Sequence, residues 1–551
     1  MSMITATAWV PRGKAAAYPT KYVFDDNEYE RIAKLAKLEL EDAKEDLEDA
    51  KQAMNETPEE TSTRKDKKGV DKDDDDIDGD VDLQDDDLKE YDLEHYDDDP
   101  EAGAKAEGSD DDDKDEMSGL FSNVKSLAYH ASNDDDPYIT LKENEESDDE
   151  EREETQILPT DNMVLAARVE DEVAHLEVYV YEDSADNLYV HHDVMLPAVP
   201  LCVEWLDAKV GKDIPTDSHG NMAAVGTLDP DIELWNLDMI DCMYPDAILG
   251  QSSQPADPTA MKKKKKKSKK ANAAYHTDSV LSLAANRTHR NLLASASADK
   301  TVKLWDLNTC TAAHSYAHHT DKVCALAWHP MQTSVLLSGS YDRTVVAADM
   351  RAPDVKVPRW GVESDVEQIK CDPHNENLFY VSTENGVLHC FDARQLPSTP
   401  EQSKAAWRLQ AHEKSLSSFS INPAIPGYIA TASTDRTVKL WNVPEGSGGP
   451  SMVTSRDIGV GKVFAANFAP DQDVAFRLAV AGSKGSVQVW DTSTNKAVRE
   501  AFAGRVKMPE AKEERLIGVE ADHEEEDEEE EAEEAANGGG ETGGWESMDE
   551  D

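Results

Sequence analysis

A two-strand pattern recurs along the second half of the chain and constrains its fold more than any other feature. Asn291–Leu307 reads NLLASASADKTVKLWDL and Gly427–Val443 reads GYIATASTDRTVKLWNV, while Leu336–Asp349 repeats the pattern with Ala348 at the tryptophan position. Small, apolar and β-branched residues predict two strands in each copy, and the central Asp predicts the tight turn between them. One such hairpin cannot bury its own apolar face, so the copies must pack together.

Weaker copies occupy three further segments, Ala223–Leu237, Leu378–Asp392 and Leu478–Asp491. The marker positions at the end of the second strand are Trp235, Trp305, Ala348, Phe391, Trp441 and Trp490, spaced by 70, 43, 43, 50 and 49 residues. A basal period of about 43 residues that contains turn signals is typical of four-stranded propeller blades.

The hairpins resemble the WD40 repeat family, whose Trp-Asp dipeptide stands at Trp305-Asp306 and Trp490-Asp491. The resemblance implies a hydrogen-bonded tetrad of His, turn Asp, strand hydroxyl and Trp. Its members here are His276, Asp299, Ser295 and Trp305, then His319, Asp342 and Ser338, then His412, Asp435, Thr431 and Trp441. A His beside an Asp could indicate catalysis, but recurrence in three blades favours a structural role, because active sites do not repeat once per module.

The N-terminus is predicted to supply the innermost strand of blade 1, because Ile4–Pro11 (ITATAWVP) resembles Cys324–Pro330 (CALAWHP). The other strands of that blade are expected at Met163–Val169, Val173–Tyr181 and Leu188–Leu196, with Tyr179 or Tyr181 in the marker position. The fold class is therefore all-β, a seven-bladed propeller over residues 156–508 that starts with residues 1–11. Ala497–Phe502 is the candidate for the last strand of blade 7.

Charge separates two appendages from the propeller. The chain has a net charge of −59, of which Asp25–Thr155 carries 52 acidic against 16 basic residues, and Pro509–Asp551 carries 20 against 2. A helix is predicted near residues 27–54, and disorder is expected over the rest of the insert and the 509–551 tail. No apolar run approaches the roughly 18 residues of a membrane span, and the six scattered cysteines fit reduced thiols in the cytosol or nucleus.

The acidic insert contains candidate docking motifs. Clusters of aromatic and aliphatic residues interrupt it, and they either order on a partner or serve as spacers. The residues proposed to dock are Tyr91, Leu93, Tyr96, Tyr138, Ile139 and Leu141. Asp74–Asp85 resembles an EF-hand loop but ends in Asp and follows no helix, so no metal or other cofactor is expected.

The lysine run MKKKKKKSKKAN is the strongest functional signal. Its eight lysines are Lys262, Lys263, Lys264, Lys265, Lys266, Lys267, Lys269 and Lys270. Such a run binds phosphates with strong salt dependence and also fits a nuclear-import signal. It falls between blades 2 and 3, which predicts the same propeller face as the hairpin turns with Lys300, Arg343 and Arg436 and the face opposite the acidic insert.

Two features of the central blades invite hypotheses. Trp360 is a candidate to fill the space left by Ala348. The sequences Asp349-Met350-Arg351 and Asp392-Ala393-Arg394 resemble the endings by which some WD40 proteins dock on a cullin ubiquitin-ligase adaptor, although solvated arginines there are also common.

A narrower resemblance covers most of the chain through Phe502. The segments EYDLEHYDDD, SNDDDPYITL, YVHHDVMLPAVPLCVEWL and the lysine run together resemble the periodic tryptophan protein family. That resemblance implies a non-enzymatic nucleolar scaffold for large (60S) subunit assembly and pre-rRNA processing, a monomer within a ribonucleoprotein particle that binds assembly factors, ribosomal proteins and pre-rRNA. The alternatives are a histone-binding chromatin protein at ribosomal DNA and a cullin substrate receptor.

Overall fold

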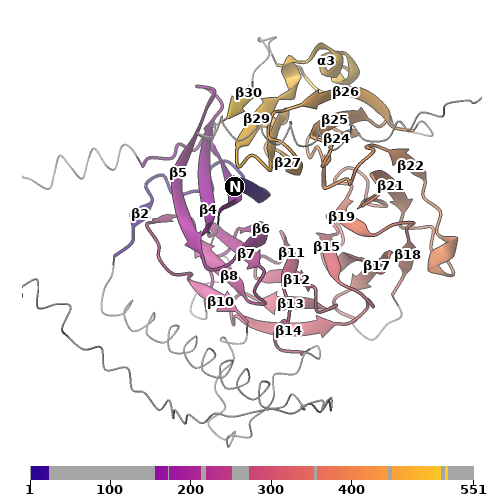
Figure 1. Ribbon diagram of the computed structural model, residues 1–551, viewed down its shortest axis with the longest axis horizontal. Helices are drawn as coiled ribbons and strands as arrows, with labels where there is room; N and C mark the ends of the chain where they lie inside the picture. Colours follow the sequence, from indigo (N-terminus) through magenta and orange to yellow (C-terminus); the bar gives the residue numbers. More distant parts are fainter. Residues whose placement is uncertain are drawn as a thin grey trace, which may run out of the picture. The chain divides into compact units, whose positions relative to one another are not determined.

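The repeated hairpins form seven four-stranded sheets arranged as the blades of a propeller (Figure 1). This computed structural model describes residues 2–23, 155–171, 173–211, 219–250, 272–352, 357–444, 449–509 and 516–518. From the axis outwards, the strands of blades 1 to 4 are β1 (Ser2–Val10), β3 (Asn162–Glu170), β4 (Val173–Glu182) and β5 (Asn187–Leu196); β6 (Pro200–Leu206), β7 (Met222–Thr227), β8 (Ile232–Asn236) and β10 (Ala247–Leu249); β11 (Val280–Ala285), β12 (Leu292–Ser297), β13 (Val302–Asp306) and β14 (Thr311–Tyr316); and β15 (Val323–Trp328), β16 (Val335–Ser340), β17 (Thr344–Asp349) and β18 (Arg359–Gly361).

Blades 5 to 7 follow the same plan. Their strands are β19 (Val366–Cys371), β20 (Leu378–Thr383), β21 (Val387–Asp392) and β22 (Trp407–Gln410); β23 (Ser418–Ile421), β24 (Tyr428–Ala432), β25 (Thr437–Asn442) and β26 (Ser451–Asp457); and β27 (Val463–Phe468), β28 (Arg477–Gly482), β29 (Val487–Asp491) and β30 (Leu516–Gly518). The remaining elements are the parallel pair β2 (Thr20–Lys21) and β9 (Met239–Ile240), the 3₁₀ turns η4 (Pro400–Gln402), η5 (Gln472–Val474) and η6 (Thr492–Thr494), and helix α3 (Lys496–Phe502).

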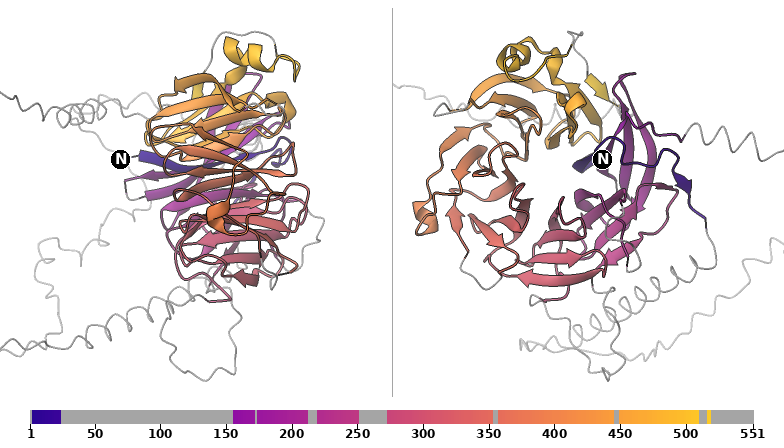
Figure 2. Two further views of the ribbon diagram at one scale, coloured as in Figure 1. Left: turned by 90° about the vertical axis from the view of Figure 1, so that its right-hand side faces the viewer. Right: turned by 180° about the vertical axis from the view of Figure 1, so that it is seen from behind.

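The N-terminal strand completes blade 1, which confirms the prediction from ITATAWVP. β1 pairs antiparallel with β3, from Ser2 opposite Glu170 to Val10 opposite Met163. The N-terminus lies inside the ring next to the yellow strands of blade 7 (Figures 1 and 2). Tyr179 pairs with Val164 as Trp305 pairs with Leu293, so Tyr179 rather than Tyr181 holds the marker position.

The hairpin turns are held by their Asp side chains. In blade 3, Asp299 Oδ1 accepts hydrogen bonds from the main-chain N of Thr301 (2.9 Å) and from its hydroxyl (2.7 Å). These bonds stabilise a left-handed backbone at Lys300, whose φ is 70°. Arg343 and Arg436 occupy the same turn position with φ of 61° and 70°. The repeated turn therefore presents a cation at its tip in three blades.

The blades pack face to face through apolar side chains. At the seam between blades 1 and 7, Trp9 and Tyr181 lie edge to face with ring centres 6.2 Å apart, in a cluster with Ala479 and Val487. Trp9 Nε1 also donates to the main-chain O of Asn467 at 2.8 Å. No strand crosses this seam among the described residues, so packing and side-chain hydrogen bonds close the ring.

The fourth strand of blade 7 differs from the prediction. Ala497–Phe502 lies within helix α3, because Asn495 Oδ1 accepts from the main-chain N of Ala497 and caps the helix, while Val498 and Phe502 are buried against blades 6 and 7. The strand is supplied by β30, whose Ile517 pairs with Val489. Part of the segment assigned to the acidic tail therefore belongs to the propeller.

The hypothesis that Trp360 fills the space beside Ala348 is wrong. Trp360 pairs with Val345, and residues 345 and 348 of one strand point to opposite faces. Trp360 packs instead on Phe379 of blade 5. Leu336, the partner of Ala348, lies in a cluster with Tyr316 of blade 3, so a tyrosine ring from the preceding blade contributes the aromatic surface at this seam.

Candidate partner-binding surfaces

The propeller has two faces that carry different segments. On one face the hairpin turns lie beside the loops that join successive blades, since Ala298 N donates to Ser279 O at 2.9 Å. Ser2 lies against Gly485 in the corresponding turn of blade 7, so the other end of β1, at Val10, reaches the opposite face. We name the first the turn face and the second the insert face.

The lysine run and the acidic insert lie outside the described residues, but their flanks can be placed. Lys262–Lys270 fall in the sequence between β10 and β11, and the described residues just before β11, at Ser279, lie on the turn face. The described residues on either side of the insert meet on the insert face, where Ile157 N donates to Ala17 O at 3.1 Å. The docking residues at positions 91, 93, 96, 138, 139 and 141, the Asp74–Asp85 loop and the helix near 27–54 are also outside the described residues.

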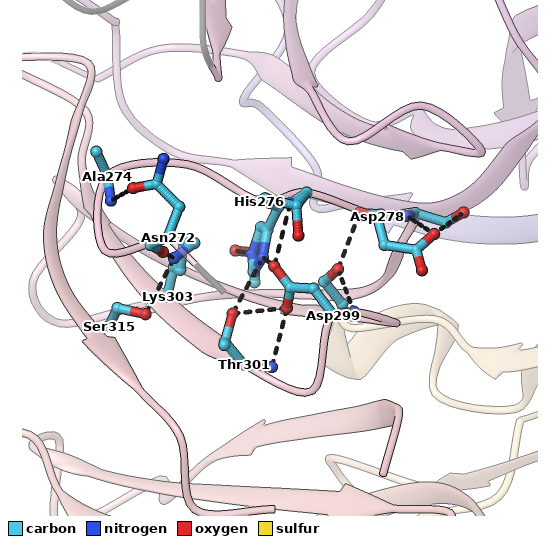
Figure 3. A network of polar contacts seen from close by, with 12 residues as sticks. Asn272, Ala274, His276, Asp278, Asp299, Thr301, Lys303 and Ser315 are labelled. Carbon is cyan, nitrogen blue, oxygen red and sulfur yellow. Dashed lines mark hydrogen bonds and ion pairs between the residues drawn. The ribbon is translucent and has the colours of Figure 1, made fainter. Parts of the chain in front are cut away.

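The tetrad residues of blade 3 meet in one hydrogen-bonded network, of which Figure 3 labels His276 and Asp299. His276 Nδ1 contacts Asp299 Oδ2 at 2.9 Å, and His276 Nε2 contacts Ser295 Oγ at 2.7 Å. Trp305 Nε1 donates to the same hydroxyl at 2.7 Å. The structure thus brings together the four side chains singled out in this blade.

Two other blades repeat the network with one difference. In blade 6, His412 contacts Asp435 at 2.8 Å and Thr431 at 2.9 Å, and Trp441 donates to the Thr431 hydroxyl at 2.8 Å. In blade 4, His319 contacts Asp342 at 3.1 Å and Ser338 at 2.8 Å, with Ala348 where the indole would be.

These distances match those of a Ser-His-Asp triad, but the surroundings do not. Ser295 and Trp305 are fully buried, and His276 is 1% exposed, so no substrate can reach the hydroxyl. A nucleophile must contact the group that it attacks. Each tetrad therefore stabilises the blade in which it lies.

Burial and hydrogen bonding fix the protonation of the blade 3 tetrad. Burial lowers the pKa of His276, against the pull of its bond to Asp299. Burial would raise the pKa of Asp299, but the hydrogen bonds from His276 and Thr301 hold it down to about 2. At neutral pH a neutral imidazole therefore donates from Nδ1 to a carboxylate, and Nε2 accepts from the Ser295 hydroxyl.

Two of the three cations at the turn tips contact the segment that leads into the next blade. Lys300 Nζ donates to the main-chain O of Thr320 at 2.9 Å, and Arg343 Nε donates to Asp365 at 3.0 Å. Arg436 stands at the matching turn of blade 6. Lys300 and Arg343 side chains remain more than half exposed, so they keep unused donors on the turn face.

A polar layer in the central cavity was missed by the sequence reasoning. The cavity measures about 690 Å³ and is lined by the inner strands. Lys370 Nζ donates to Asn467 Oδ1 of blade 7 at 3.1 Å and lies 5.9 Å from the Phe419 ring centre. Burial lowers the pKa of Lys370 to about 8, while the Glu204 carboxylate acts against that shift.

The register could have revealed this layer. Glu204, Lys370 and Asn467 occupy the same position of their inner strands. Each stands one residue before the inner-strand residue whose partner on the second strand pairs with the marker residue. The equivalent residues in the other blades are small: Ala8, Ala284, Ala327 and Ser420. Aligning the inner strands would therefore have singled out three polar side chains around the axis.

The two Asp-x-Arg endings fold back on themselves. Arg351 Nη2 donates to Asp349 at 2.8 Å, and Arg394 Nη2 donates to Asp392 at 2.7 Å. The side-chain bond from Arg351 to Asp349 lowers the pKa of that carboxyl. Both guanidiniums are more than two thirds exposed, so they are accessible but already paired.

Among the described residues, no helix has the length and apolar character needed to cross a membrane. In the same residues, His, Cys, Asp and Glu side chains form no group that could hold a metal ion.

Comparison with known proteins gives matches at two levels. The WD domain, G-beta repeat family matches residues 272–306, 310–346 and 403–442. An uncharacterized WD repeat-containing protein of Schizosaccharomyces pombe is 48% identical over 94% of this chain and 95% of its own length. Periodic tryptophan protein 1 of Saccharomyces cerevisiae is 40% identical over 93% of this chain and 91% of its own, and a homolog in Drosophila melanogaster is 30% identical over 54% and 61%.

Proposed function

Because this chain belongs to the periodic tryptophan protein 1 family of WD repeat proteins, we propose that it is a nucleolar scaffold for large (60S) ribosomal subunit assembly and pre-rRNA processing. The observation that carries the proposal is the 40% identity to the yeast protein over 93% of the chain. A match of that extent spans the acidic insert and the lysine run as well as the blades. The proposal therefore covers the appendages too.

In this proposal the propeller faces and the acidic insert both bind proteins. The propeller faces bind assembly factors or ribosomal proteins, since a rigid ring offers broad surfaces fixed relative to one another. The tyrosine and leucine motifs of the insert add further contacts and raise the local concentration of whatever they bind. The buried Ser295 hydroxyl and its repeats support a non-enzymatic role.

Lys262–Lys270 contact the phosphate backbone of pre-rRNA from the turn face. Eight lysines in nine residues neutralise phosphates and release counterions without reading bases. The exposed Lys300 and Arg343 lie on the same face and extend the cationic surface. The same run serves as the nuclear-import signal in this proposal.

We predict that replacing Lys262–Lys267 with serine weakens RNA binding and nuclear accumulation. Six lost cations should reduce the slope of log affinity against log salt by up to about 4, at roughly 0.7 per phosphate contact on single strands. Filter binding at several salt concentrations and imaging of a tagged chain measure the two effects. Replacing the same lysines with arginine is the matched control and should preserve both; unchanged salt dependence in the serine variant would contradict the assignment.

Sequencing of RNA crosslinked to the protein in cells, together with affinity purification, tests the scaffold proposal. The expected result is precursor rRNA with 60S assembly factors. Enrichment of histones and ribosomal DNA would favour the chromatin alternative. Enrichment of cullin adaptors would favour the substrate-receptor alternative, which the internal pairing of Arg351 and Arg394 makes less attractive.

A further inference from the structure

Two tip cations of the turn face stand next to carboxylates. Lys300 Nζ lies 3.8 Å from Asp321, and Arg343 Nε lies 3.0 Å from Asp365. Both aspartates come within two residues of the start of the next inner strand, β15 or β19. The loops that lead into these strands therefore carry acidic residues that offset the tip cations of blades 3 and 4.

Lysines take the place of such acidic residues at the seam between blades 6 and 7. Lys462 stands directly before β27, as Asp365 stands directly before β19. Lys484 stands two residues after the end of β28, as Asp299 stands two residues after the end of β12. Two positions that carry carboxylates elsewhere on the turn face therefore carry cations here.

Main-chain contacts bring both lysines next to the tip cation of blade 6. Arg436 N and the first residue of β27 both donate to the main-chain O of Ser433, each at 3.3 Å. In the blade 7 hairpin, Lys462 N donates to Ser483 Oγ at 2.9 Å, and Lys484 follows directly in the chain. The main chains of Arg436, Lys462 and Lys484 are therefore neighbours, and we call these three residues the cationic cluster.

The two seams differ in formal charge over their turn-face loops. The loops are 341–343, 362–365 and 384–386 at the seam of blades 4 and 5, and 433–436, 458–462 and 483–486 at the seam of blades 6 and 7. The first set holds one basic and four acidic residues, a net charge of −3, and the second holds three basic residues and one acidic residue, a net charge of +2. The charged residues that border the second set, Glu413, Lys414, Arg456 and Asp457, sum to zero.

The cationic cluster is open to solvent. Lys462 and Lys484 are exposed, and Arg436 is half-buried. Asp435, the one acidic residue of these loops, pairs with His412 in the blade 6 tetrad rather than with Arg436. Arg436 and Lys462 form no ion pair with any residue that the structure describes. Their donors are therefore available to an anionic group.

The acidic C-terminal segment begins beside this cluster. β30 pairs antiparallel with β29, with Gly518 opposite Gln488, which is four residues from Lys484. Because β29 starts from the turn-face hairpin, Gly518 lies at the turn-face end of its blade. Residues 519–551 contain 17 acidic residues and no lysine or arginine. Glu524–Glu531 are all acidic and start six residues after Gly518, a distance that an extended chain covers in about 20 Å.

We propose that residues 519–551 dock on the cationic cluster of their own chain. Glu524–Glu531 supply carboxylates, Arg436 forms the two-pronged contact that guanidiniums make with such groups, and Lys462 and Lys484 add single contacts. The acidic insert is the poorer occupant, because its described flanks lie on the opposite face.

The tether at β30 makes the docking effective although each ion pair is exposed and weak. Attachment to the same chain keeps the acidic run at a high local concentration. Exposed pairs add little to the stability of the fold, so the docked segment shields the seam without becoming part of the propeller. A polyanionic partner has to displace it. This inference goes beyond the ribosomal role proposed above and does not depend on it.

Zero-length crosslinking of carboxylates to lysines in the full chain tests the docking. Mass spectrometry should find Glu524–Glu531 joined to Lys462 at low salt. Arg436→Gln combined with Lys484→Gln should lower the yield of that crosslink about fivefold, because two cations are lost while the reacting lysine is kept. A mixture of heavy-isotope-labelled and unlabelled chains should give crosslinks within one isotope only, because the contact is within one chain.

Lys300→Gln combined with Arg343→Gln is the matched control, because it removes two cations of the same face from other blades. It should leave the yield unchanged, and both double variants should melt with the parent, since none of the substituted side chains is buried. Crosslinks confined to Lys262–Lys270, crosslinks between chains of different isotope, or equal yields in the two double variants would overturn the proposal.

Ultraviolet crosslinking of an oligouridylate tests RNA as the other possible occupant. A full chain with amides in place of the eight acidic side chains of Glu524–Glu531 should crosslink more RNA at Arg436 and Lys462, relative to the yield at Lys300, than the parent does. The reason is that the docked segment shields the cluster in the parent. Equal relative yields in the two chains would identify an open phosphate-binding surface and would rule out the docking.

Discussion

Burial decides what a constellation of residues does in this protein. Ser295, His276 and Asp299 lie at the distances of a catalytic triad, yet the hydroxyl is fully buried and accepts from the Trp305 indole. Its hydrogen-bonding capacity is spent inside the blade. The residue types that perform acyl transfer in an accessible site therefore stabilise the interior of the blade here.

We predict that Ser295→Ala destabilises the protein more than Ser338→Ala. The first variant leaves both His276 Nε2 and Trp305 Nε1 without their partner, whereas the second leaves only His319 Nε2. Each buried polar group left unpaired costs about 1–3 kcal/mol, so the two losses should differ by about that amount. Urea unfolding of the two single variants measures the difference, and equal losses would show that the indole bond adds nothing.

We predict that Lys370 makes the free energy of unfolding rise with pH in the alkaline range. Its pKa is about 8 in the folded chain and about 10.4 when unfolded, so between these pH values the unfolded chain binds more protons and stability rises with pH. Lys370→Met removes that contribution. The stability of the parent relative to this variant should therefore increase by about 1–3 kcal/mol from pH 7.5 to 10. Unfolding midpoints of both proteins across that range test it, and a constant difference would mean that the ammonium is well solvated.

At the scale of elements, the strands and turns that depend on residues close in sequence were predictable. Elements that depend on more distant parts of the chain were harder to predict. The hairpins with Asp299, Asp342 and Asp435 were predictable because turn chemistry and strand patterning act within about fifteen residues. The N-terminal strand was found only through its likeness to another inner strand. Helix α3 was missed although Asn495 is a good N-cap, because the spacing of the repeats predicted a strand at the same residues.

The candidate sites show the same division. The tetrads were predictable because a repeated motif brings their members together in each blade. The polar layer of the central cavity was not, since only the strand register aligns Glu204, Lys370 and Asn467 on their inner strands. Lys370 and Asn467 approach each other across the axis from strands nearly 100 residues apart.

The C-terminal segment offers a test of which element closes blade 7. Truncation after Gly518 should leave stability unchanged, whereas truncation after Pro509 removes β30 and its pairing with β29. We expect the shorter chain to lose about 1–3 kcal/mol, since it forfeits the pairing of Leu516–Gly518 and the packing of Ile517 at the seam with blade 1. Thermal unfolding compares the two, and hydrogen exchange at Val489 locates the change. Equal stability of both truncated chains would contradict a structural role for β30.

The whole ring depends on a seam that no strand bridges among the residues that the structure describes. β1 belongs to blade 1 and β27 to β30 belong to blade 7. Contacts between side chains must therefore close the ring in place of a strand shared by the two blades. Asn467 is central to them, because its main-chain O accepts from Trp9 while its side-chain amide donates to Thr7 O at 3.1 Å. Asp471, which follows β27 in the sequence, accepts from Arg12 N at 3.0 Å and from Asn162 Nδ2 at 2.8 Å.

We predict that Trp9→Ala opens this seam and that Trp328→Ala, at the equivalent inner-strand position of blade 4, does not open its own. Both indoles donate to a main-chain oxygen of the preceding blade, to Asn467 at 2.8 Å and to Ala284 at 2.9 Å. Trp9 is the more buried, and β1 is joined to the rest of its blade only through the long insert, so the strand can detach without unfolding its neighbours.

Trp9→Ala should therefore cost about 3–5 kcal/mol, as for large buried aromatics. It should also accelerate hydrogen exchange in β1, β3 and β27. Trp328→Ala should cost less and leave exchange in the flanking inner strands β11 and β19 near that of the parent. If both variants lose the same stability and exchange stays slow in β1, the ring is held by its sheets as a whole rather than by the N-terminal strand.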